Sequence, residues 1–128
     1  MDEKMPSLQS PSALMLVGVL ALAFCSTPAA ARDYYGAIAF SQGSGADGYS
    51  TNYSTQGGAQ TKALQECGGG CKVILWFKNA CGALAVGKGN GYGSGWAASS
   101  GEAQTIAVTE CSKNSTNCGV KRWACTTR

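Results

Sequence analysis

Hydrophobic residues in the second part of the chain lie in short stretches that glycine-rich segments separate. GAIAF (36–40) and GALAV (82–86) are short apolar stretches that are typical of strands. GYSTNY (48–53) and GYGSGWA (91–97) alternate aromatic residues with small or polar ones, which is the two-residue period of a strand. The glycine-rich segments QGSGADG and GKGNG predict hairpins between these strands.

A helix is expected after each pair of strands. Thr55 and Ser99 are residue types that cap helix N-termini, and Glu102 completes a capping-box pattern with Ser99. The sequence alanine, alanine, cysteine then recurs at a spacing of four, at positions 59, 63 and 67 and at positions 103, 107 and 111. This spacing puts small side chains on one helix face, which lets the helix approach a sheet closely. A further strand is expected to begin at Cys71 and at Cys118.

The two halves of this pattern repeat each other. GAIAF matches GALAV at three of five positions, and TQGGAQTKALQEC matches SSGEAQTIAVTEC at seven of thirteen. CKVILWFK (71–78) matches CGVKRWAC (118–125) at three of eight. The order is the same in both halves, and the offsets of 46, 44 and 47 residues differ only in the expected loops, where insertions are tolerated. We infer an internal duplication with units at about 34–79 and 80–125.

Each unit reads as two strands, a helix and a third strand. One such unit leaves apolar surface exposed, and two units related by a pseudo-twofold axis can bury that surface against each other. The sequence therefore predicts an α+β domain with the arrangement ββαβ–ββαβ, about six mainly antiparallel strands and two helices. The pattern leaves open whether the strands form one sheet or two.

The first 31 residues have the features of a secretory signal peptide. The apolar run ALMLVGVLALAFC (13–25) is followed by Pro28 and three alanines. The run has 13 residues, which is too short to cross a bilayer as a helix. We expect cleavage after Ala31, which leaves a single domain at 32–128, secreted or periplasmic and without a stable membrane span. A retained anchor and a lipidated Cys25 are the alternatives.

Six cysteines follow the predicted cleavage site, and an even number in a short exported chain indicates disulfides. Cys67–Cys71 and Cys111–Cys118 would each join a helix to its following strand, at equivalent places in the two units. Cys81 and Cys125 would form the third bridge. This is the first-ranked of the fifteen pairings that six cysteines allow. A zinc site is the rival interpretation, which the spacing and the absence of histidine disfavour, so no metal is expected.

The charge of the chain does not indicate a nucleic-acid-binding protein. Residues 32–128 contain nine lysines and arginines and five acids, and the basic residues are scattered along the sequence. This is a mild preference for anionic surfaces.

The residues needed for common enzyme mechanisms are mostly missing. The sequence contains no histidine, which excludes Ser-His and Cys-His nucleophile systems. Glu66 and Glu110 are equivalent residues of the two units, and they could form a carboxylate pair across the pseudo-twofold axis. The simpler interpretation is that both face solvent. The glycine-rich segments lack the phosphate-loop pattern. We therefore expect a protein that is not an enzyme and that has no cofactor.

Aromatic and basic residues give a candidate binding surface. Strict alternation along 71–78 places Trp76 with Lys72 and Lys78 on one face, away from the helix. Trp123, with Lys121 and Arg122, is its counterpart in the second unit. Aromatic residues of the neighbouring strands would adjoin this face, namely Tyr49, Tyr92 and Trp96. Such a surface suits a glycan, an anionic lipid or a protein. The alternative is that the two tryptophans pack the core between the units.

The motifs taken together resemble a known family. GAIAF, the GYS strand, the helix that ends at a cysteine, CKVILWF, CGALAVG and the closing RWAC are similar to the family called domain of unknown function 4189. The resemblance covers about residues 34–125. It implies a small exported bacterial protein with disulfides and an internal duplication, and it implies no catalytic residues.

The sequence therefore favours an exported binding module whose partner is a protein or a component of the cell envelope. An inhibitor or immunity protein for an envelope-directed toxin is a more specific form of this hypothesis. A secreted effector that acts on a host and a small hydrolase that uses Glu66 and Glu110 are the alternatives.

Overall fold

The computed structural model describes residues 32–127, so the predicted signal peptide and Cys25 lie outside the described residues. The elements of the first repeat are β1 (Tyr35–Phe40), β2 (Asp47–Tyr53), α1 (Gln56–Cys67) and β3 (Lys72–Lys78). The second repeat consists of β4 (Cys81–Val86), the 3-10 turn η4 (Lys88–Asn90), β5 (Tyr92–Ala97), α2 (Ser100–Ser112) and β6 (Gly119–Cys125). The predicted ββαβ–ββαβ arrangement is confirmed.

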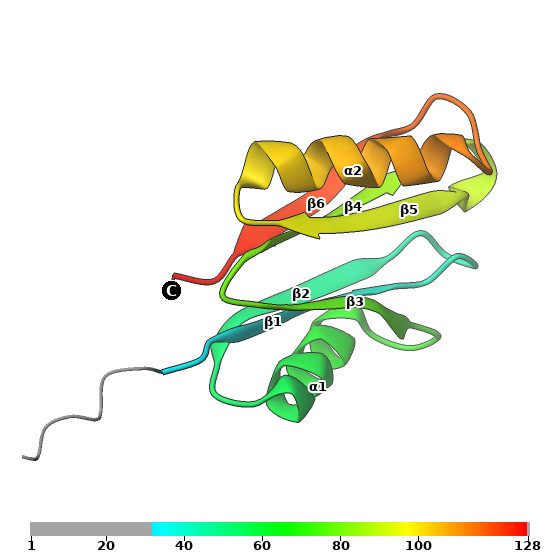
Figure 1. The fold of residues 1–128 in the computed structure, drawn as a ribbon. Coiled ribbons are helices and arrows are strands. Elements are labelled where there is room, and N and C mark those ends of the chain that lie inside the picture. The colour runs from blue at the N-terminus through cyan, green and yellow to red at the C-terminus, as the bar shows by residue number, and fades with distance from the viewer. Residues whose placement is uncertain (1–31, 128) are drawn as a thin grey trace, which may run out of the picture. The chain divides into compact units, whose positions relative to one another are not determined.

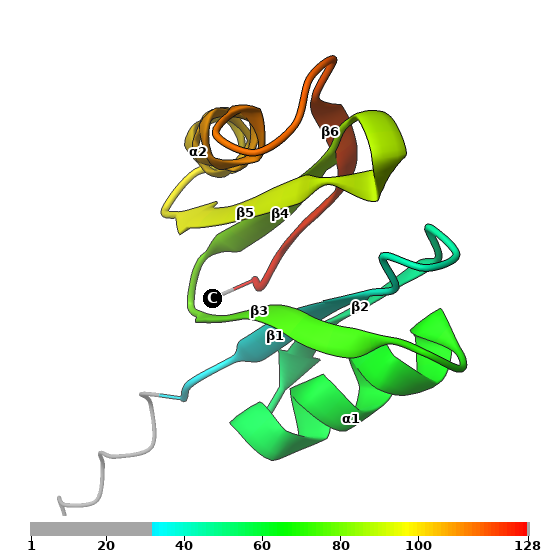
Figure 2. The ribbon, with the colours of Figure 1, turned by 90° about the vertical axis from the view of Figure 1, so that its right-hand side faces the viewer.

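The six strands form two antiparallel sheets, one from each repeat. The first sheet has the order β2-β1-β3 and the second has the equivalent order β5-β4-β6. The sheets face each other, and the helices cover the two outer faces, so that the layers run α2, second sheet, first sheet, α1 (Figures 1 and 2). Across the interface β1 contacts β4, β2 contacts β6 and β3 contacts β5, as a pseudo-twofold axis requires.

Each helix packs on its sheet through the small residues that the sequence pattern indicated. Ala59 and Ala63 of α1 are fully buried against Ala37 and Ala39 of β1, and an equivalent cluster lies under α2. The Thr55 hydroxyl accepts a hydrogen bond from the backbone N–H of Gly58 at 3.0 Å. Ser99 caps α2 in the same way. The predicted N-caps are therefore confirmed, and the caps fix where each helix begins.

The central core lies between the two sheets. Its buried members are Ile38, Phe40, Phe77, Ala80, Leu84 and Ala124. Gly36 and Gly82 both leave space for the Phe77 ring, since a Cβ atom at either position would lie 2.5 Å from that ring. This close approach explains why GAIAF and GALAV both begin with glycine. One side chain of the first repeat thus fills a space that both repeats leave open.

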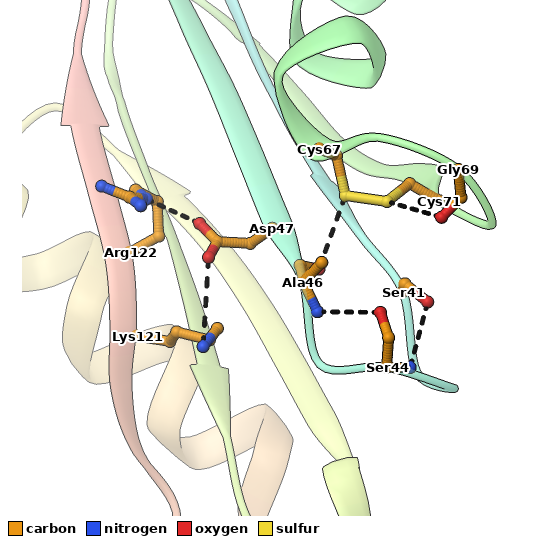
Figure 3. Close-up of a disulfide and its surroundings, with 9 residues drawn as sticks. All are labelled: Ser41, Ser44, Ala46, Asp47, Cys67, Gly69, Cys71, Lys121 and Arg122. Atoms are coloured by element: carbon orange, nitrogen blue, oxygen red, sulfur yellow. Dashed lines mark hydrogen bonds and ion pairs between the residues drawn. A yellow bond between two sulfur atoms is a disulfide. The ribbon is translucent and has the colours of Figure 1, made fainter.

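Three disulfides stabilise the domain, and they join the pairs that the repeat favoured. Cys67–Cys71 and Cys111–Cys118 connect each helix to the strand that follows it (Figure 3 shows the first of these). Cys81–Cys125 links the directly opposite ends of β4 and β6. Within residues 32–127 every bridge lies inside one repeat. Apart from the backbone connection between β3 and β4, non-covalent contacts therefore hold the two repeats together.

Candidate functional site

The two repeat-equivalent tryptophans lie on the helix sides of their sheets, so the prediction that they face away from the helices is wrong. Trp76 lies opposite Ala37, whose side chain packs against α1. Trp123 lies opposite Ala83, which packs against α2. Directly opposite residues share a face of a sheet. The side chains are 43% and 50% exposed, so the tryptophans do not pack the core between the repeats either.

A β-bulge in β3 is the physical reason for this error. The pairing of β1 and β3 passes from Ile38–Leu75 directly to Ala39–Val73, which leaves Ile74 as an extra residue. Strict alternation fails across a bulge. Ile74 and Leu75 therefore both pack against the central core, although alternation assigned them to opposite faces.

The second repeat has a bulge at the equivalent place. The pairing of β4 and β6 passes from Leu84–Arg122 to Ala85–Val120, so Lys121 is the extra residue. Lys121 and Arg122 thus correspond to Ile74 and Leu75 of the first repeat. Both bulges direct two consecutive side chains toward the interface between the sheets.

The β2–β6 edge of this interface is polar. The Arg122 guanidinium donates a hydrogen bond to the Asp47 carboxylate at 2.6 Å, and the Lys121 Nζ lies 4.0 Å from the same carboxylate (Figure 3). The Asp47 side chain is only 10% exposed. Arg122 also lies over the Tyr49 ring, at 4.8 Å from its centroid. A charge-assisted hydrogen bond and a cation–π contact therefore close this edge.

The β3–β5 edge is equivalent by the pseudo-twofold axis, but it is apolar and open. A cavity of about 500 Å³ is lined by Trp96 of β5 and by five consecutive residues of β3, Ile74 to Lys78. Trp76 and Phe77 point to opposite faces of the first sheet, so a cavity that both of them line must run along the edge of the strand. We call this cavity the β3–β5 groove.

Exposed aromatic surface borders the β3–β5 groove. Trp96 is 59% exposed, which is the largest exposure of any tryptophan in the domain. The Trp76 ring packs beside Tyr35, with 6.2 Å between the two ring centroids. The Lys78 Nζ lies 6.0 Å from the centroid of the same tyrosine ring. An open apolar groove with large aromatic side chains at its border is typical of a recognition site.

The nine residues predicted as one binding surface are thus distributed over several places. Trp76, Lys78 and Trp96 line the β3–β5 groove, whereas Tyr49, Lys121 and Arg122 belong to the polar edge. Tyr92 is partly buried and packs on Phe40 with 5.3 Å between ring centroids. The last two lie elsewhere: Lys72 is exposed at the start of β3, and Trp123 lies on the α2 side of its sheet. The sequence interpretation missed Leu75 and Phe77 as groove residues, because alternation without the bulge assigned them to the face opposite Trp76. It also did not name Ile74, although alternation placed that residue on the same face as Trp76.

The two glutamates considered as a carboxylate pair are not brought together. Glu66 lies on α1 and Glu110 on α2, which cover opposite outer faces of the domain (Figure 2). Lys62 binds Glu66 at 2.8 Å and Lys113 binds Glu110 at 2.9 Å. The hydrogen bond and the charge of Lys62 lower the pKa of Glu66 and, in return, Glu66 raises the pKa of Lys62. A lowered pKa keeps the carboxylate ionised, which is the opposite of what a general acid requires.

A second, polar cavity lies at the loop end of the domain. It measures about 630 Å³, and its lining includes Gln42, Lys88, Tyr92, Glu110 and Asn114. Gln42 and Asn90 exchange hydrogen bonds there, at 3.3 and 3.0 Å, and so connect the two repeats. Among residues 32–127 no three His, Cys, Asp or Glu side chains gather as metal ligands. The polar side chain of Gln42 at this cavity is thus already bonded within the domain. The β3–β5 groove has exposed apolar side chains instead, and we take it as the stronger candidate for a binding site.

Comparison with known proteins gives one family and several mycobacterial relatives. Residues 35–125 match the family described as "Domain of unknown function (DUF4189)". Protein Rv1269c of Mycobacterium tuberculosis and Protein Mb1300c of Mycobacterium bovis are each 47% identical over 57 residues, which is 44% of this chain and 44% of each relative. The match thus spans less than half of the length of these relatives.

A solved structure extends the similarity to the whole domain. The NMR structure of Rv1813c from Mycobacterium tuberculosis matches with a TM-score of 0.57 and 25% sequence identity. The match covers 94% of this chain and 99% of the other. Neither helix in the part of the chain that the structure describes has the length and apolar character that crossing a membrane requires.

Proposed function

The chain belongs to the family described as a domain of unknown function (DUF4189), and on this premise we propose that it is an exported, non-enzymatic binding module. Its ligand is a protein or another component of the cell envelope, held in the β3–β5 groove. The observation that carries the proposal is the difference between two equivalent edges. Arg122 and Asp47 close one edge with an ion pair, whereas Leu75 and Trp96 leave an open apolar groove at the other.

Export is supported by the covalent framework and by the sequence that precedes the domain. Three disulfides in a small domain suit an oxidising compartment, such as the periplasm or the exterior of the cell. The signal-peptide pattern of residues 1–31 agrees with such a location.

A binding role is favoured over hydrolysis by the placement of the acidic residues. Glu66 and Glu110 lie on different helices. Glu66 is bound to Lys62 of α1, and Glu110 is bound to Lys113 at the C-terminal end of α2. A pair of carboxylates that cleaves a glycosidic bond must flank the same bond, at a separation below about 10 Å. Helices on opposite outer faces do not provide such a pair.

The proposal includes two more specific roles, which differ in where the protein acts. An inhibitor or immunity protein for an envelope-directed toxin would stay in the envelope with its target. An effector that acts on a host would leave the cell. Fractionation of cells and culture medium, followed by detection of the mature domain in each, distinguishes the two roles.

Affinity capture with matched baits tests the binding role. The oxidised domain at 32–128, its Trp96→Ala variant and its Trp123→Ala variant are used on envelope and culture-medium fractions of the organism that makes the protein. Trp123 is the control, because it is 50% exposed but lies outside the β3–β5 groove. We expect one stoichiometric partner on the native and Trp123→Ala baits and at least about a tenfold loss on Trp96→Ala. Equal recovery on all three baits would overturn the assignment of the groove.

A further inference from the structure

We propose that the β3–β5 groove binds an extended segment of a partner protein, which adds as a fourth strand to the free edge of β3. The segment carries apolar residues in its centre and acidic residues at both ends. This inference rests on the proposed binding function, and it specifies the class of ligand and the mode of recognition.

The first step is that β3 has free backbone groups on its outer edge. Among residues 32–127, β3 is a terminal strand of its sheet and pairs only with β1. The backbone N–H of Asn79 donates to the carbonyl of Tyr34 at 2.9 Å. Hydrogen-bonded and non-hydrogen-bonded pairs alternate along an antiparallel ladder. The backbone N–H and C=O groups of Trp76 and Lys78 therefore point away from β1, toward the edge where the groove lies.

The second step is that side chains cover both faces of the position where an added strand would lie. Trp76 stands on the helix side of the first sheet, next to Tyr35. Trp96 stands on the other side, since it lies opposite Gly82, which faces the Phe77 ring in the interface between the sheets. Alternate side chains of an added strand would contact one tryptophan or the other. Main-chain hydrogen bonds with apolar contacts on alternate side chains are the pattern of strand addition.

The third step concerns charge, and it disfavours a second copy of this chain as the occupant. β3 begins and ends with lysine, at Lys72 and Lys78. If two copies of β3 paired with each other, the ladder would carry four lysines and no acidic residue. Like charges on neighbouring strands destabilise a strand pair. A segment with acidic residues at both ends would instead face both lysines, whichever direction it runs. Lys78 lies 3.9 Å from the Asp33 carboxylate, and both side chains are about half exposed, so at this end the acid of the segment would share the lysine with Asp33.

The test uses two synthetic peptides and the oxidised domain at 32–128. The peptide EEVFVFVEE has the proposed chemistry, and KKVFVFVKK has the same centre with the opposite charges. Amide hydrogen exchange is followed by NMR, because only strand addition protects the outward N–H groups of Trp76 and Lys78. We expect EEVFVFVEE to slow exchange at both amides by at least about tenfold and to leave Trp123 unchanged, with KKVFVFVKK at least about tenfold weaker.

A charge-reversal pair provides the matched control. Lys72→Glu/Lys78→Glu should invert the preference between the peptides, whereas Lys88→Glu/Lys113→Glu, with the same change in net charge, should retain it. Movement of the Trp96 indole signal without protection of the two amides would overturn strand addition and leave the proposed binding function standing. No binding of EEVFVFVEE at millimolar concentration would overturn the inference. Protection that rises with protein concentration alone would show a second copy in the groove and would also overturn it.

Discussion

Leu75 and Arg122 occupy equivalent positions in the two repeats, with Leu75 opposite Ile38 in the first sheet and Arg122 opposite Leu84 in the second. Both follow a bulge, and both point toward the interface between the sheets. Arg122 meets Asp47 there, at 2.6 Å, whereas Leu75 lines an open groove. Differences at a few equivalent positions, with Leu75 in place of Arg122 among them, thus separate an edge that is closed by charge from an edge that is open.

Removal of Arg122 should destabilise the domain. The variant Arg122→Leu leaves the Asp47 carboxylate, which is 10% exposed, without its main partner. We expect a loss of about 1–3 kcal/mol in the free energy of unfolding, measured by urea denaturation. Tyr92, opposite Val86, is the register equivalent of Asp47, opposite Phe40. The double variant Asp47→Tyr/Arg122→Leu therefore replaces both charged residues by their equivalents from the other repeat, and it should recover most of this loss. A double variant that is less stable than the single one would contradict this account.

The three disulfides should contribute unequally to stability. Cys81–Cys125 spans a sequence separation of 44 residues, against 4 for Cys67–Cys71. The loop-entropy relation gives about 4 kcal/mol for the long loop and about 2 kcal/mol for the short one. We therefore expect the Cys81→Ala/Cys125→Ala variant to melt well below the Cys67→Ala/Cys71→Ala variant in a calorimetric comparison. Equal melting temperatures would show that loop length does not govern the effect.

Phe77 and Trp76 should respond very differently to truncation, because the bulge sends one into the core and the other to the surface. Phe77 is 2% exposed between the sheets, and Trp76 is 43% exposed beside Tyr35. Phe77→Ala should cost about 3–5 kcal/mol of unfolding free energy. Trp76→Ala should cost less than half as much. Denaturant titrations measure both losses, and a larger loss for Trp76→Ala than for Phe77→Ala would contradict the assignment of Phe77 to the core.

The pKa of Glu66 should depend on Lys62. The hydrogen bond and the charge of Lys62 lower this pKa, so the Lys62→Met variant should return it toward its ordinary value. Because the pKa is lower in the folded state, the pair adds its small stabilisation above the ordinary pKa of glutamate, and this is lost as the pH falls through the lowered pKa. Carbon-13 NMR titration of the side-chain carboxyl measures the change. Lys72→Met, on β3, is the control, and an equal change in that variant would exclude a specific pair.

Local patterns in the sequence were sufficient to predict the elements and the covalent framework. The duplication, the caps at Thr55 and Ser99 and the alanine stripes all depend on residues close together in the chain. The disulfide pairs followed from the equivalence of the two repeats. The number of sheets did not follow, because the same six strands can pair within a repeat or between repeats.

The faces of β3 and β6 were the part that sequence reasoning could not assign. A bulge shifts the alternation by one residue, and nothing in KVILWFK marks Ile74 as the extra residue. One signal was nonetheless present in the aligned repeats, where Ile74 and Leu75 replace Lys121 and Arg122 beside equivalent tryptophans. That difference in charge distinguishes the β3–β5 edge from the β2–β6 edge.

Photo-crosslinking in the organism that makes the protein tests the central claim, that the β3–β5 groove is the binding site, most directly. A photoreactive phenylalanine analogue replaces Trp96 in one variant and Trp123 in another, since both positions are exposed and only the first lines the groove. We predict a discrete covalent adduct from position 96 and none from position 123. Absence of an adduct at position 96, or equal adducts at both positions, would contradict the claim.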